Sequence, residues 1–136
     1  LAGIAPVRMF YTASNHDELS AYHAIKYLSA WFRSDPRVEI DTDARPRKYL
    51  LYGNTLLGFG HGNREGPGGT KDKASRLASM MPIEAADLWG RARFREFHAA
   101  HLHSEQMIQE INGVIVRRIA ALLESRHLKE TRTQFI

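Results

Sequence analysis

Apolar and polar positions follow regular patterns along the chain and predict short strands mixed with amphipathic helices. The apolar stretch from Ile4 to Tyr11 has the length of a buried strand. From about Glu18 to Arg33, apolar residues recur every three or four positions, which predicts a helix with one buried face. The segment Val38–Ile40 then alternates as a further short strand does. The residues expected on the buried face of the helix are Leu19, Tyr22, Ile25, Leu28 and Phe32.

Two turn sequences predict β-hairpins in the rest of the chain. Gly53-Asn54 joins the apolar runs Lys48–Tyr52 and Thr55–Phe59. Asn112-Gly113 lies in the middle of the segment Gln106–Ile119 and is the stronger hairpin signal of the two.

Between the hairpins, the pattern predicts helices and one more strand. A helix is expected to begin at Thr70, whose hydroxyl can cap it, and to be interrupted by Pro82. A second short helix is expected over Ile83–Trp89, and a strand over Ala92–Ala100. This mixture indicates an α/β or α+β layered domain. The buried face of the first of these helices is expected to carry Ala74, Leu77, Ala78 and Met81.

Length and composition narrow the class of protein. A chain of 136 residues suits one domain, and its 43% hydrophobic and 25% charged residues are ordinary for a globular protein. No apolar run approaches the roughly 20 residues of a membrane span, so we expect no membrane association. The absence of cysteine excludes disulfides and thiolate zinc sites, and it suits a cytoplasmic location.

The charge is mildly basic, with a net charge of +4. The segment 120–136 is a basic tail, in which we expect a helix. A positive surface permits nucleic acid as a partner, but no binding motif supports it, so a solvated face is the simpler interpretation.

Three predicted strands each run into a polar turn that carries histidine. The ends of parallel strands collect ligands in open α/β sheets, so these turns can converge although they are distant in sequence. Imidazole and amide oxygen are suitable ligands for zinc, manganese, iron or nickel. A surface histidine is the simpler interpretation for any one turn, whereas the three together favour a metal site. The turns are Ser14-Asn15-His16-Asp17, Gly60-His61-Gly62-Asn63 and His101-Leu102-His103.

The three turns resemble motifs of the calcineurin-like metallophosphoesterases. Asn15-His16-Asp17 is similar to their Gly-Asn-His-Asp/Glu motif, Gly60-His61 to their Gly-His motif, and Ala100-His101-Leu102-His103 to their closing Gly-His-x-His motif. The string NTLLGFGHGN and the hairpin after His103 are similar to members of the family carried by phages and prophages. The resemblance covers the chain to about Ile119 and implies part of an αββα sandwich.

The resemblance further implies a site with two divalent metal ions, which in this family are manganese, iron, zinc or nickel. It implies that Asn15, His61 and His101 hold one ion, and that His103 holds the other. The substrate would be a phosphomonoester or a phosphodiester, possibly of nucleic acid.

The catalytic roles are also implied by the resemblance. His16 would lie beside the phosphate, where it protonates the leaving oxygen or stabilises the transition state, and Asp17 would orient its ring. Taken by itself, Asp17 is more simply a helix cap. The glycine-rich loop after His61 also offers Arg64, whose guanidinium can meet a phosphate.

Two motifs of the family are absent from this chain. No aspartate has a histidine two residues on, and no Gly-Asp pair is present to begin the Gly-Asp-x-x-Asp motif that bridges both ions. Both motifs precede the Asn-His-Asp motif in the family. We therefore expect residues 1–136 to be the C-terminal portion of a phosphoesterase domain that is inactive alone and holds one ion or none.

An alternative function stays open from the sequence. The chain is then a non-catalytic, phage-related module that contacts nucleic acid through its basic surface. In either case, a sheet that lacks its first strands exposes an edge, which allows a homo-oligomer.

Overall fold

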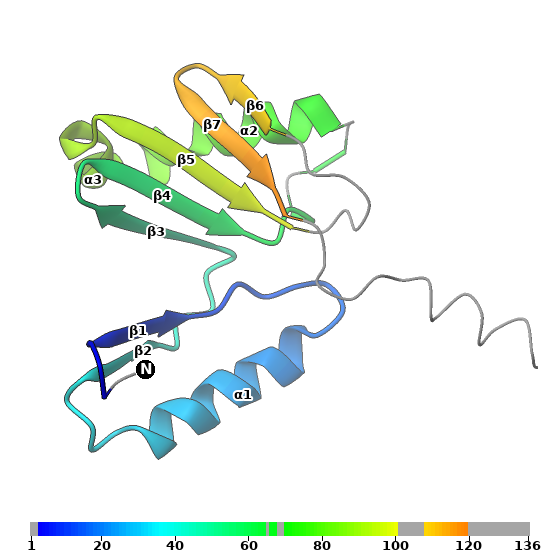
Figure 1. Ribbon diagram of the computed structural model, residues 1–136. Coiled ribbons are helices and arrows are strands. Elements are labelled where there is room, and N and C mark those ends of the chain that lie inside the picture. The colour runs from blue at the N-terminus through cyan, green and yellow to red at the C-terminus, as the bar shows by residue number, and fades with distance from the viewer. Residues whose placement is uncertain (1–2, 65, 68–69, 101–107, 120–136) are drawn as a thin grey trace, which may run out of the picture.

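A computed structural model gives the fold and describes residues 3–64, 66–67, 70–100 and 108–119. Helices and strands are mixed in two neighbouring groups of elements, one blue to cyan and the other cyan-green to orange in Figure 1. This arrangement confirms the general α+β class. The predicted helix in the segment 120–136 lies outside the described residues, and so do His101 and His103.

The first group is a strand–helix–strand unit. Strands β1 (Val7–Phe10) and β2 (Val38–Asp41) pair in parallel, and helix α1 (Glu18–Trp31) connects them. All three elements confirm the sequence prediction, although β1 is shorter than expected. Ile25 lies on the buried face of α1 as predicted, but Leu19 is 70% exposed, so its predicted burial is wrong. In this unit the first turn of α1 extends beyond the two strands β1 and β2 (Figure 1), so Leu19 has no strand to pack against there.

The second group is a five-stranded sheet. Its strands are β3 (Arg47–Tyr52), β4 (Thr55–Gly60), β5 (Phe94–Ala99), β6 (Ile108–Ile111) and β7 (Val114–Arg118). They lie in the order β3-β4-β5-β7-β6, in which the central three strands are parallel and the two edge strands are antiparallel to their neighbours. Both predicted hairpins, β3–β4 and β6–β7, are therefore confirmed.

Two helices cover one face of this sheet, as Figure 1 shows: α2 (Thr70–Glu84) and α3 (Ala86–Arg91). The buried core between the layers includes Phe97, Leu56 and Val116 from the sheet, and Leu77 and Met81 from α2. The apolar spacing that predicted α2 thus marks its sheet-facing side.

The prediction that Pro82 interrupts α2 is wrong. The helix continues to Glu84, and the backbone N–H of Ala85 still donates to the carbonyl oxygen of Met81 at 3.0 Å. Proline removes one hydrogen bond of the helix, but only the last turn follows here, so little helix remains to be disrupted. The next helix accordingly begins at Ala86 rather than at Ile83.

The two groups meet where β1 and β2 approach β3 and β4. The rings of Phe10 and Phe59 have centroids 5.0 Å apart, and Lys48 Nζ donates to Asp41 Oδ2 at 3.0 Å. In the part of the chain that the structure describes, no helix is long and apolar enough to cross a membrane.

Candidate functional site

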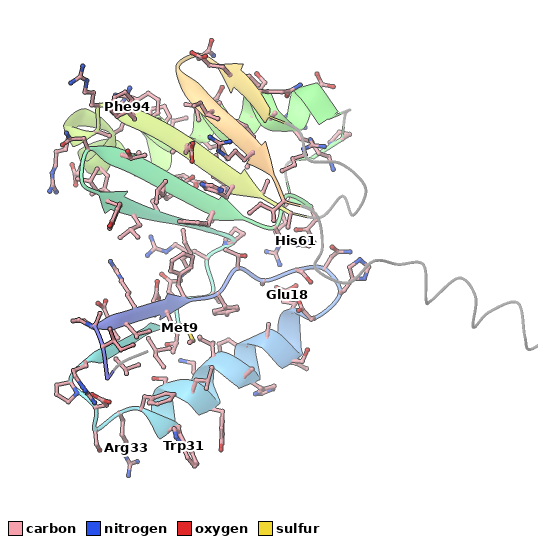
Figure 2. All side chains as sticks on the ribbon, viewed as in Figure 1. Met9, Glu18, Trp31, Arg33, His61 and Phe94 are labelled. Carbon is pink, nitrogen blue, oxygen red and sulfur yellow. The ribbon has the colours of Figure 1, made fainter. Side chains whose placement is uncertain are left out.

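Two of the predicted turns meet at one end of the molecule. Nε2 of His61, which follows β4, lies 3.1 Å from Oδ1 of Asn15, in the turn that leads from β1 to α1. Figure 2 shows His61 at the carboxyl end of the sheet, facing the start of α1 near Glu18. The contact brings together two residues that are 46 positions apart in the sequence.

Asn15 contacts a second imidazole as well. Its Nδ2 lies 3.2 Å from Nε2 of His16. With the amide in this orientation, His61 donates to Asn15 and Asn15 donates to His16, because an amide nitrogen is a donor and an amide oxygen an acceptor. The Asn15 amide therefore holds the imidazole rings of His16 and His61 on either side of it. His16 itself is exposed to solvent.

Short-range hydrogen bonds shape the turn that carries Asn15. The backbone N–H of His16 donates to Ser14 Oγ at 3.1 Å, the Ser14 hydroxyl donates to the Asp17 carboxylate, and Ser20 Oγ donates to the Asp17 carbonyl oxygen at 3.1 Å. Asp17 occupies the N-cap position of α1, but its carboxylate makes no cap hydrogen bond to the helix. Its partner is Ser14, so the expectation that Asp17 orients the ring of His16 stays a prediction.

The end of the parallel sheet positions His61. Gly60 of β4 is paired with Ala99 of β5, and the backbone N–H of Ala100 donates to the carbonyl oxygen of His61 at 3.1 Å. The two strands therefore end together, as expected for neighbouring parallel strands. The ligand roles of His101, which follows Ala100 directly, and of His103 stay predictions, since both lie outside the described residues.

The Asn15–His61 pair has the donor chemistry and the spacing of two ligands of one metal ion. Adjacent ligands that each lie about 2.0–2.2 Å from an ion are about 3 Å apart in octahedral geometry and about 3.3–3.6 Å apart in tetrahedral geometry. The observed separation is 3.1 Å between an amide oxygen and an imidazole nitrogen. Among the described residues, no group of three or more His, Cys, Asp or Glu residues is arranged to hold a metal. Further ligands would have to come from outside this pair.

An ion pair lies beside this contact. Arg64 Nη2 and Glu18 Oε1 are 2.5 Å apart, and the two side chains are 46% and 60% exposed. The pair connects the loop after β4 to the first turn of α1. In this structure a carboxylate engages Arg64, so its predicted contact with a phosphate stays a prediction.

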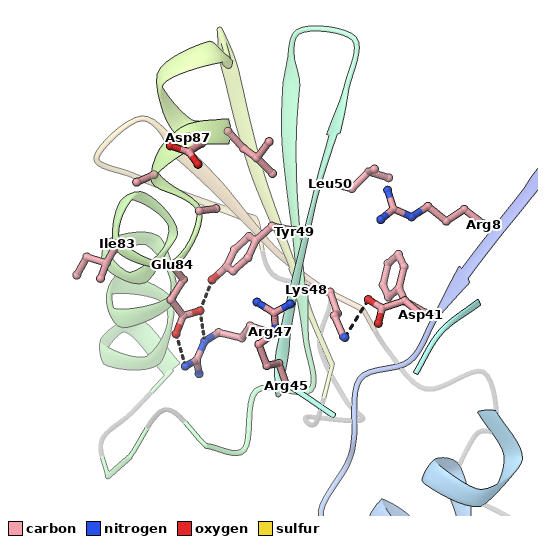
Figure 3. A pocket seen from close by; sticks show the side chains of 14 residues that line it. Arg8, Asp41, Arg45, Arg47, Lys48, Tyr49, Leu50, Ile83, Glu84 and Asp87 are labelled. Carbon is pink, nitrogen blue, oxygen red and sulfur yellow. Dashed lines mark hydrogen bonds and ion pairs between the residues drawn. The ribbon is translucent and has the colours of Figure 1, made fainter. Parts of the chain in front are cut away.

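A cavity of 450 Å³ lies elsewhere, between β1, β3 and the helices (Figure 3). Glu84 accepts from Arg47 Nε at 2.8 Å, from Arg47 Nη2 at 2.6 Å and from the Tyr49 hydroxyl at 2.7 Å. Hydrogen bonds from Arg47 hold the pKa of Glu84 below its usual value despite partial burial. Burial, together with the neighbouring Glu84, raises the pKa of Tyr49 far above its usual range. Tyr49 therefore stays protonated and Glu84 ionised at neutral pH, so we assign this cluster a structural role.

Sequence reasoning missed the Arg47–Glu84–Tyr49 cluster. Glu84 is 37 residues from Arg47 in the chain, and no motif or spacing relates them. His98, on strand β5, is held by neighbouring side chains. His98 lies 3.2 Å from Glu96 and is stacked on the ring of Phe59, with the ring centroids 5.3 Å apart.

Comparisons of this chain with protein-family models, with curated proteins and with solved structures found no match. Its function is therefore argued from its own residues and their geometry.

Proposed function

We propose that this chain provides part of a metal-dependent phosphoesterase centre. The observation that supports this most directly is the 3.1 Å contact between Asn15 Oδ1 and His61 Nε2. Both residues belong to turns that resemble metallophosphoesterase motifs. His61 directly follows β4, and Asn15 lies in the turn between β1 and α1. Convergence of such turns at one end of a fold is typical of a binding site.

Each residue of the proposed centre has a distinct role. Asn15 and His61 supply an oxygen and a nitrogen donor to a divalent cation, together with His101, and His103 serves a second cation. Bound cations polarise the phosphoryl group and favour hydroxide at neutral pH. His16 is exposed beside Asn15, where its ring can pass a proton to the leaving oxygen of a phosphomonoester or phosphodiester.

The proposed centre lacks the negative charge that two divalent cations need. The donors named above are all neutral, and the chain contains neither the Asp-x-His nor the Gly-Asp-x-x-Asp motif. Two adjacent cations repel each other, and a carboxylate that bridges them offsets this repulsion. We therefore propose that the chain by itself holds a single ion, at the Asn15–His61 pair, and turns over little or no phosphoester. The corresponding fold is part of an αββα sandwich.

Binding of Mn²⁺, measured by isothermal titration calorimetry, tests the proposal without requiring turnover. We expect Asn15→Ala and His61→Ala each to weaken Mn²⁺ binding at least tenfold, about 1.4 kcal/mol or more, because each removes one donor. The matched control is His23→Ala, which removes an exposed histidine on α1 and should leave the affinity unchanged.

His16→Ala separates the proposed catalytic role from metal binding. This variant should bind Mn²⁺ like the wild type but bind inorganic phosphate more weakly in its presence, because His16 faces the phosphate rather than the cation. Equal Mn²⁺ affinity in the wild type, Asn15→Ala and His61→Ala contradicts the metal centre. If duplex DNA then binds with a strong salt dependence, the chain is instead a nucleic-acid-binding module.

A further inference from the structure

A second cavity, of 590 Å³, lies between the glycine-rich loop and α2. Small-molecule sites commonly measure about 300–1,000 Å³, so this cavity has room for more than a single phosphate group. Its described lining includes three guanidinium groups, two serine hydroxyls and one carboxylate. The charged lining residues are Arg47, Arg64, Arg76 and Asp72.

The three arginines differ in how firmly they are held. The side chain of Arg47 is 13% exposed and is fixed by two hydrogen bonds to Glu84. Arg76 Nη1 donates to the carbonyl oxygen of Pro67 at 2.6 Å, so it connects α2 to the loop. The cavity wall is therefore built from side chains with defined contacts.

Arg64 is the arginine that can change partner. Both side chains of its ion pair with Glu18 are about half exposed, and exposed pairs of this kind contribute little to stability. A phosphate carries at least as much negative charge as a carboxylate and, like a carboxylate, can accept two parallel hydrogen bonds from a guanidinium. A bound phosphate can therefore replace Glu18 at little cost.

Arg64 also connects the cavity to the candidate metal site. It lines the cavity, follows His61 by three residues, and pairs with Glu18 in the first turn of the helix that begins after Asn15. A ligand with one phosphate at the Asn15–His61 pair would pass Arg64 before it enters the cavity.

We propose that this cavity is a second phosphate subsite, so that the ligand of the centre carries at least two phosphate groups, one at the Asn15–His61 pair and one beside Arg64 and Arg76. This inference rests on the proposed function and specifies its ligand class. Glu18 acts as the resting partner of Arg64 and gives way to the ligand.

A pair of nucleotides that differ by one phosphate tests the subsite. Adenosine 3′,5′-bisphosphate and adenosine 5′-monophosphate are titrated into the chain in the presence of Mn²⁺. The wild type should bind the bisphosphate about tenfold more tightly, as expected for one additional charge-assisted contact. Arg76→Gln should remove this preference and leave the affinity for the monophosphate unchanged.

Two further variants test whether the preference for the bisphosphate depends on the cavity itself or only on the loss of a positive charge. Ser79→Phe fills the cavity without removing a charge, and it should remove the preference as Arg76→Gln does. Arg33→Gln removes an exposed charge at the far end of α1 (Figure 2) and should preserve the preference. A preference that persists in both Arg76→Gln and Ser79→Phe contradicts the assignment of the cavity.

The outcomes distinguish this inference from the proposed function. Normal Mn²⁺ binding through Asn15 and His61, with equal affinity for the two nucleotides, overturns the second subsite alone. Loss of the metal centre in the separate Mn²⁺ titration overturns the proposed function. A 5′-phosphorylated thymidine dinucleotide in a third titration separates the two sources of paired phosphates. If the dinucleotide binds more tightly than adenosine 3′,5′-bisphosphate, the natural ligand is a nucleic-acid backbone. If it binds more weakly, the natural ligand is a small bisphosphate.

Discussion

At the residue scale, single polar side chains connect parts of the chain that are far apart in sequence. The Asn15 amide contacts both His16 and His61, and Glu84 accepts from both Arg47 and Tyr49. The first set is a candidate for chemistry because Asn15 and His16 are exposed to solvent. The second is satisfied within the protein. Its contribution is therefore to stability, and that contribution can be measured.

Glu84→Gln should lower the free energy of unfolding by about 1–2 kcal/mol, because it weakens hydrogen bonds from a charged partner in a partly exposed cluster. Glu39→Gln, which breaks the exposed pair with Arg8, should have a smaller effect. Urea denaturation at pH 7 measures both. An equal loss in the two variants contradicts the structural role of the Glu84 cluster.

The same variant has a predicted pH dependence. The folded protein lowers the pKa of Glu84 below its usual value of 4.5, so ionised Glu84 stabilises the fold above that pH. This stabilisation is lost as the pH falls from about 4.5 through the lowered pKa. The difference in stability between the wild type and Glu84→Gln should therefore be constant near neutrality and shrink in acid.

At the scale of elements, the residues at the ends of helices and strands matter most for where each element begins and ends. Asn112 and Gly113 have φ angles of 51° and 75°, the left-handed pair that a two-residue hairpin requires. Asn-Gly predicts this hairpin correctly because these two residues readily adopt the positive φ angles that its turn requires. Pro82, in contrast, predicted a helix end that the structure does not have, because proline is tolerated in a last turn that packs well.

Gly113→Ala should destabilise the β6–β7 hairpin by about 1–2 kcal/mol, because an alanine pays a steric cost in the left-handed region. Asn112→Gly is the control, since glycine adopts a positive φ readily and should leave the stability nearly unchanged. Thermal unfolding followed by circular dichroism measures both. Unchanged stability of Gly113→Ala means that the turn adopts a different conformation.

At the scale of the whole molecule, the candidate metal site lies at the junction of the two groups of elements. One of its donors, Asn15, belongs to the β1–α1–β2 unit, and the other, His61, to the five-stranded sheet. The Arg64–Glu18 and Lys48–Asp41 pairs cross the same junction. A cation held by both donors would therefore act as a crosslink between the groups.

Mn²⁺ should stabilise the whole chain for this reason. At about 100 times its Kd, a ligand that binds only the folded state adds about 2.7 kcal/mol to the free energy of unfolding. Amide hydrogen exchange should slow in both turns, 12–17 and 61–64, and Asn15→Ala should show neither effect. Protection confined to one turn is the result that rejects a shared cation.

The sequence by itself determined the elements and the turns between them. Periodicity and turn residues depend on local geometry, so α1, both hairpins and the helix over Ala74 and Met81 were predictable. The tertiary structure alone decided which distant residues meet. The Asn15–His61 contact depends on how the two groups of elements pack, and the Arg47–Glu84 cluster depends on how α2 packs on the sheet. The exposure of Leu19 depends on how far α1 extends beyond β1 and β2. Periodicity and turn residues report only on neighbours in the sequence. They therefore cannot predict contacts between segments that are far apart in the chain.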